Sequence, residues 1–98
     1  MTSTAKFPLG RVLATPGALR AMEASGQEPA FFLDRHVIGD WGVVCPDDAQ
    51  LNDEALKDGA RIISAYSTLK GVKLWIITEA TDGMGQRPAT TIMLPSEY

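Results

Sequence analysis

The sequence predicts an α+β fold in which three short N-terminal helices are followed by a three-stranded antiparallel β-meander. Three helix start signals, each containing a proline and followed by a glycine stop, occupy the first part of the chain. From Arg61 onward the pattern changes to an alternation of two residues, which is typical of strands. A chain of 98 residues has the length of one domain, so we assign residues 1–98 to a single domain.

Local chemistry explains both ends of each predicted helix. Proline suits the first helical position because the N–H that it lacks would be unpaired there, and glycine tolerates the left-handed conformation that ends many helices. In the third helix, Leu51, Ala55 and Leu56 are expected to form the apolar face. The run Arg11–Ala14 precedes the first helix and is either an edge strand or an extended lead-in. The predicted starts are Thr15-Pro16, Glu28-Pro29 and Cys45-Pro46, and the predicted stops are Gly26, Gly39 and Gly59.

The last third of the chain predicts three strands joined by short connections. The first runs from Arg61 to Ser67, and Lys70-Gly71 suits the hairpin turn that follows it. Lys73–Glu79 is apolar on both faces, as expected of a central strand. The segment Thr81–Ala89, with two glycines, is expected to be a mobile loop before a last strand that ends at Leu94. Consecutive strands with short connections favour an antiparallel meander.

One face of this sheet is expected to lack a helical cover, and it carries our candidate partner-binding residues. If Leu74 and Ile76 point inward, then Trp75, Ile77 and Glu79 point outward and form a contact patch. Trp41, in the compact turn Asp40-Trp41-Gly42, is either a surface anchor for a partner or a plug of the core, and the second is favoured. The candidate partner-binding residues are Trp75, Ile77, Glu79, Tyr66 and Trp41.

The composition excludes several classes of protein. The formal charge of −3 argues against nucleic-acid binding driven by bulk charge, so direct binding of nucleic acid is not expected. The single cysteine, Cys45, cannot form an internal disulfide, which fits a cytoplasmic location. No signal peptide or apolar run of membrane-spanning length is present, so no membrane association is expected. The polar segment 1–6 is expected to be flexible.

Candidate catalytic residues are few, and a structural interpretation is favoured for each. His36 with Asp40 four residues later is either a general base with its orienting carboxylate or a partly buried, hydrogen-bonded histidine near the helix end, where its cation favours the C-terminal dipole. Cys45 is expected to cap or pack rather than to act as a nucleophile, and Asn52 is expected to tether a loop backbone. The acids of the third helix are too widely spaced to share a metal ion, so no metal or cofactor is expected. His36, Arg61, Glu79 and Thr90 are the candidate catalytic residues if the chain is a small nuclease, in which such polar residues share one cleft.

Several segments carry a resemblance to a known family. They are Arg35–Gly42, Asn52, Arg61–Tyr66, Trp75–Ala80 and Thr90–Tyr98. Over most of the chain from Phe7 onward, the sequence resembles a family of small bacterial proteins associated with plasmids and mobile elements, a family without an established activity. In these relatives the hairpin before the paired threonines is shorter and carries an acid–Arg pair, whereas here Arg87 stands near the end of a longer loop.

The resemblance implies cargo that assists a mobile element by evading host defence, by stabilising a plasmid or by poisoning a host. Small size, mild acidity, the expected Trp75 and Ile77 face and the lack of a recognisable catalytic set favour an accessory protein of a plasmid or phage that binds a host or mobile-element protein. Inhibition of a host defence system such as CRISPR-Cas, as by an anti-CRISPR protein, is one form of this hypothesis. One alternative is a metal-independent RNase toxin of the barnase/RelE type that uses His36, Arg61, Glu79 and Thr90. The other alternative is a structural homodimer joined through the open face of the sheet. The sequence does not decide whether the chain is an enzyme, although the lack of a recognisable catalytic set favours a binding protein.

Overall fold

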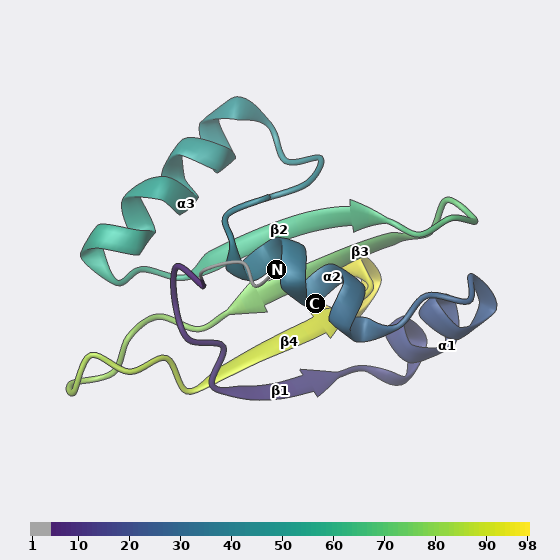
Figure 1. Cartoon of the computed structure of the whole chain (residues 1–98), viewed down its shortest axis with the longest axis horizontal. Helices are drawn as coiled ribbons and strands as arrows, with labels where there is room; N and C mark the ends of the chain where they lie inside the picture. The colour runs from purple at the N-terminus through teal and green to yellow at the C-terminus, as the bar shows by residue number, and fades with distance from the viewer. Residues whose placement is uncertain (1–4) are drawn as a thin grey trace.

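Four strands form one mixed sheet in the order β1-β4-β3-β2 (Figure 1). The computed structural model describes residues 5–98. The expected flexible segment 1–6 therefore lies outside the described residues except for Ala5 and Lys6, and the Lys6 N–H donates to the carbonyl of Val37 at 2.8 Å. The strands are β1 (Arg11–Ala14), β2 (Ile62–Ser67), β3 (Lys73–Thr78) and β4 (Ala89–Met93).

The predicted α+β class is confirmed, but the predicted three-stranded sheet and the helix-first order are wrong. β2, β3 and β4 form the expected antiparallel meander with β3 in its middle. The correction concerns β1, which precedes all three helices and pairs in parallel with β4, Arg11 lying opposite Ala89. β1 and β4 lie near opposite ends of the sequence, so no local sequence pattern predicts their pairing. Of the two options for Arg11–Ala14, the edge strand is correct.

The helices begin and end close to the expected residues. They are α1 (Pro16–Ala24), α2 (Pro29–Val37) and α3 (Pro46–Asp58), and each starts at the proline that signalled it. The Thr15 hydroxyl accepts a hydrogen bond from the Ala18 N–H and so caps α1. Gly59 ends α3 with a φ of 82°, and a Cβ there would lie 2.4 Å from the Thr81 hydroxyl, so only glycine suits this position.

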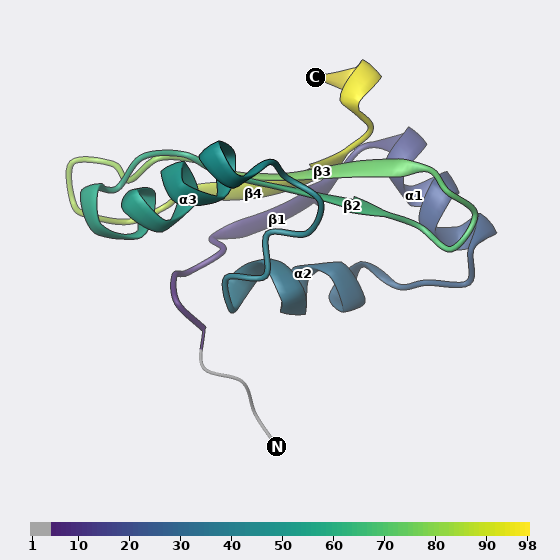
Figure 2. The same ribbon diagram turned by 90° about the horizontal axis from the view of Figure 1, so that it is seen from above.

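Helix α2 covers one face of the sheet, whereas the short helix η1 (Pro95–Glu97) lies on the opposite side (Figure 2).

Two apolar clusters form the core. The first joins α1 and α2 to the covered face and contains Ala18, Met22, Phe32, Tyr66, Leu74, Ile76 and Ile92. The second contains Phe7, Trp41, Ala55 and Ile62. In the second cluster Trp41 is a buried core residue, as the favoured interpretation predicted. Its indole N–H donates to Asp53 at 3.0 Å, a contact that was not predicted.

Candidate functional site

A chain of hydrogen bonds crosses the helix-covered face of the sheet and contains the only histidine of the sequence, His36. The His36 Nδ1 is hydrogen-bonded to the Ser64 hydroxyl, and the Nε2 to the Thr78 hydroxyl at 2.8 Å. The Thr78 hydroxyl is 2.7 Å from that of Thr90, which donates to the carbonyl of Leu9 at 2.7 Å. All four side chains of this His36 network are fully buried, so the network joins α2, β2, β3 and β4 inside the molecule.

The environment of His36 favours the neutral imidazole. The pKa of His36 is lowered from 6.5 to about 4. Burial is the larger cause of this shift, and the positive charge of Arg87 is the smaller one. The rings of Phe7 and Trp41 pack edge-on against the imidazole, with centroids 5.1 and 6.0 Å away. With no exposed surface and both nitrogens occupied, His36 has no access to a substrate. The expected hydrogen-bonded helix histidine is confirmed, but the expectation of a partly buried cation is wrong, because complete burial favours the neutral imidazole.

The expected pairing of His36 with Asp40 does not occur. Asp40 instead accepts from Arg35 at 2.7 Å and from the Gly42 N–H at 3.2 Å. The hydrogen bond from Arg35 is the main cause that lowers the pKa of Asp40. Gly39, with a φ of 88°, lies between His36 and Asp40 and turns the chain away from the helix axis.

The four residues of the nuclease hypothesis are divided between the two faces of the sheet. His36 and Thr90 belong to the buried network on the helix-covered face. Arg61 and Glu79 are exposed, and the alternation of strand side chains places them on the other face. The sheet therefore separates the proposed base from the proposed phosphate-binding cation, and the four residues share no cleft.

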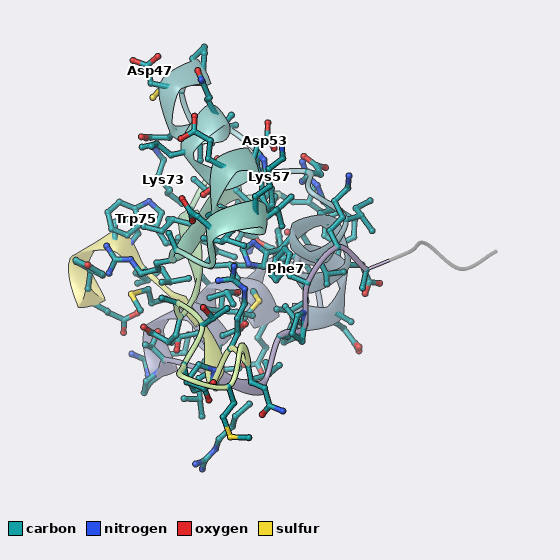
Figure 3. The ribbon with its side chains drawn as sticks, turned by 90° about the vertical axis from the view of Figure 1, so that its left-hand side faces the viewer. Phe7, Asp47, Asp53, Lys57, Lys73 and Trp75 are labelled. Carbon is teal, nitrogen blue, oxygen red and sulfur yellow. The ribbon has the colours of Figure 1, made fainter. Side chains whose placement is uncertain are left out.

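The other face of the sheet is bordered by α3, and a groove runs between them. Figure 3 shows Trp75 and Lys73 on this side of the molecule, with Asp53, Lys57 and Phe7 toward the opposite side. We call this hollow, of about 600 Å³, the α3 groove. Its apolar lining includes Val43, Leu51, Ile63, Ala65 and Trp75, and its charged lining consists of Asp48, Glu54, Asp58, Arg61 and Lys73.

Leu51 belongs to this groove and not to the core. It is 61% exposed, so its expected place on the buried face of the third helix is wrong. The helix buries Asn52 and Ala55 instead, because α3 packs against the edge of the sheet beside β2 and only a narrow stripe of it is covered. Val43, which precedes α3, is 63% exposed on the same groove. Cys45 also lines the groove and is an exposed free thiol.

Tyr98 contacts two of the residues that line the groove, Trp75 and Arg61. Its ring packs edge-on against Trp75 with centroids 5.7 Å apart, and its hydroxyl accepts from Arg61 at 2.8 Å. Glu97 holds the same segment against α1, because its carboxylate accepts from the Thr15 hydroxyl and from the Gly17 N–H. These hydrogen bonds lower the pKa of Glu97, and the one from Thr15 is the largest cause.

Only part of the predicted contact patch is exposed. The expectation of an outward, accessible Ile77 is wrong, because this side chain is 2% exposed between its cross-strand neighbours Ile63 and Thr91. Tyr66 and Trp41 are also buried and present no surface to a partner. Trp75 is half-buried and Glu79 is exposed, so of the candidate partner-binding residues these two remain accessible.

Two residues without a predicted site role hold the region together. Arg87 is buried and donates to the carbonyls of Ala55, Ala60 and Glu79 at 2.9, 2.7 and 3.0 Å. It thereby joins the end of the glycine-containing loop to α3, and burial lowers the pKa of its guanidinium.

Asn52 binds both backbone groups of Ile63, donating to the carbonyl at 2.8 Å and accepting from the N–H at 3.1 Å. The expected tether at Asn52 is present, although it holds a strand and not a loop.

Within residues 5–98, no group of three or more His, Cys, Asp or Glu side chains is arranged to hold a metal ion. None of the helices in that range is long and apolar enough to cross a membrane. Comparisons with protein-family models, with curated proteins and with solved structures find no match for this chain.

Proposed function

We propose that this protein acts by binding another protein through the α3 groove. The observation that supports the proposal is the exposure of large apolar side chains along the α3 groove. Val43 is 63% exposed and Leu51 is 61% exposed, and both lie beside the half-buried Trp75. Contiguous apolar surface of this kind is typical of interaction sites. Complete burial of one such side chain contributes about 1.5–3 kcal/mol, so a partner that fills the groove gains a useful part of its binding free energy there.

The charges of α3 define the chemistry of the partner. This helix carries five acids against one lysine, Lys57. Among the described residues, Arg35 and Asp40 form the one ion pair within 4.0 Å, so the acids of α3 have no cation partner there. On the sheet side of the groove, Arg61 is already hydrogen-bonded to Tyr98. We therefore assign to the groove an apolar segment of a partner protein, flanked by lysine or arginine residues that lie along α3. Three of the five acids, Asp48, Glu54 and Asp58, line the groove. Asp47 is not among the lining residues, and Asp53 accepts from the Trp41 indole N–H on the other side of α3.

Site-specific crosslinking tests this binding. A photoreactive amino acid replaces Leu51 in the groove or, as the control, Leu69 in the β2–β3 turn, which is 80% exposed. In lysate of a bacterial host, we expect one discrete adduct from position 51 and none of that mass from position 69. With the partner purified, Leu51→Glu is expected to weaken binding at least tenfold, about 1.4 kcal/mol, and Leu69→Glu to leave it unchanged. Adducts that do not depend on the position of the probe refute the proposal.

The resemblance to proteins of plasmids and mobile elements supports a more specific form of this proposal. In this form the partner is a component of a host defence system such as CRISPR-Cas, and the protein inhibits it. Phage challenge of cells with an active defence system is the test, with wild type compared with Leu51→Glu. We expect wild type to restore infection and the variant not to. Full immunity in the presence of wild type removes this form while leaving the crosslinking result to decide on groove binding.

A further inference from the structure

The two edges of the sheet differ in how their backbone groups are used, and β2 has a closed edge. The Val43 N–H donates to the Ala65 carbonyl at 2.8 Å, and the Ala65 N–H donates to Trp41 at 3.1 Å. Asn52 occupies both backbone groups of Ile63. The outward N–H and C=O groups of Ile63 and Ala65 are therefore paired within the chain, which blocks the addition of another strand there.

The edge at β1 is open. Figure 1 shows β1 at the border of the sheet, and no helix or strand within residues 5–98 lies beyond it. The Arg11 N–H donates to the carbonyl of Pro88, the residue before β4, at 3.0 Å, and the Thr15 N–H donates to that of Ile92 in β4 at 2.9 Å. By the alternation of a parallel ladder, the backbone groups of Val12 and Ala14 point away from the sheet. Val12 and Leu13 are also 45% and 41% exposed, so the edge is apolar as well as unpaired.

We propose that a second copy of this chain pairs with β1, edge to edge and antiparallel, with a two-fold axis at Leu13. Val12 of each copy then exchanges backbone hydrogen bonds with Ala14 of the other, and the two Leu13 side chains meet between them. A register centred on Val12 requires Gly10 in the ladder, but its φ of 65° ends the extended backbone. A register centred on Ala14 places Val12 opposite Pro16, which has no N–H to donate. The register at Leu13 is the one that the backbone permits.

Charge complementarity supports the second copy as the occupant. In this register Arg11 of one copy lies opposite Thr15 of the other, whose hydroxyl is bonded to the Glu97 carboxylate. Arg11 and Glu97 are both exposed. The two-fold axis therefore places two Arg11–Glu97 pairs symmetrically across the interface. Since β1 and β2 are opposite edges of the sheet, both α3 grooves remain open in the dimer.

Disulfide trapping tests the register with a matched pair of variants in a Cys45→Ser background. Leu13→Cys places two thiols in a directly opposed pair without ladder hydrogen bonds, where the Cα atoms are about 4.5 Å apart, within reach of a disulfide. Val12→Cys is equally exposed, but its equivalent in the other copy is displaced by two residues. We expect mild oxidation to convert Leu13→Cys to a covalent dimer at least ten times faster than Val12→Cys. Equal rates, or no covalent dimer from Leu13→Cys, overturn the proposal.

Sedimentation equilibrium of the unmodified chain provides the second measurement. An interface made by one short strand is small, so we expect reversible dimerisation within a range up to about 1 mM. Arg11→Glu places an acid opposite Glu97 and is expected to weaken the dimer at least tenfold, whereas Leu69→Lys, in a remote turn, leaves it unchanged. A chain that is monomeric over the whole range, or a dimer insensitive to Arg11→Glu, contradicts this arrangement.

Discussion

Acidification is expected to destabilise the fold through His36 before it affects the carboxylates. In the folded chain the pKa of His36 is lowered to about 4 by burial and by Arg87, and in the unfolded chain it returns to the ordinary 6.5. The stabilisation is therefore complete above pH 6.5 and is lost as the pH falls through the interval from 6.5 to 4. One pKa unit corresponds to about 1.36 kcal/mol, so the full loss is about 3 kcal/mol, of which about 2 kcal/mol falls between pH 7 and pH 5.

Urea unfolding at pH 7, 6 and 5 measures this loss, with the fluorescence of the buried Trp41 as a probe. The matched control is His36→Gln, which retains polar groups for the Ser64 and Thr78 hydroxyls but does not titrate. Ordinary aspartate and glutamate side chains titrate near pH 4, so their contribution down to pH 5 is small and is shared by both proteins. Equal losses of unfolding free energy in wild type and His36→Gln refute the assignment of His36 as a buried neutral base.

Three further substitutions distinguish residues that stabilise the fold, Arg87 and Asn52, from Leu51, which is exposed in the groove. Arg87→Met leaves three backbone carbonyls without their buried donor and is expected to cost about 2–4 kcal/mol in chemical denaturation, with Arg87→Lys recovering only part of it. Asn52→Ala unpairs both backbone groups of Ile63, so we expect a loss of about 1–3 kcal/mol and concentration-dependent aggregation in light scattering. Leu51→Glu alters an exposed side chain and is expected to change the free energy of unfolding by no more than about 0.5 kcal/mol, and the same small change is expected for Leu69→Glu. A large loss of stability in Leu51→Glu contradicts its placement in the groove.

The parts of the fold that sequence reasoning found are those encoded by neighbouring residues. A proline start and a glycine stop act within one or two turns of chain, so the three helices were predicted nearly to the residue. The meander followed from alternation and short connections for the same reason. The parallel pairing of β1 with β4 was missed because it depends on two segments from opposite ends of the chain, and four residues carry little pattern of their own.

The candidate site was predicted only in part because burial is a tertiary property. Alternation correctly separated Trp75 and Ile77 from the helix-covered residues, but it gave no indication that flanking side chains bury Ile77. The position of α3 at an edge of the sheet, which exposes Leu51 and forms the groove, involves contacts distant in sequence, such as the tether from Asn52 to Ile63 and the hydrogen bond from Arg87 to Ala55. Arg87 stands at the end of a polar loop, where no local signal distinguishes a buried arginine from a solvated one.

The distribution of satisfied polar groups is the reason to look for function on the surface and not in the core. Across residues 5–98, no buried side-chain nitrogen or oxygen lacks a hydrogen-bond partner. An enzyme of the nuclease kind needs a base or a cation whose hydrogen-bonding capacity is still free in a cleft. Here the three buried titratable side chains with perturbed pKa values, His36, Tyr66 and Arg87, all form hydrogen bonds within the chain. The unused binding capacity consists of apolar side chains and acids at the α3 groove and of backbone groups at β1, and both kinds suit a protein partner.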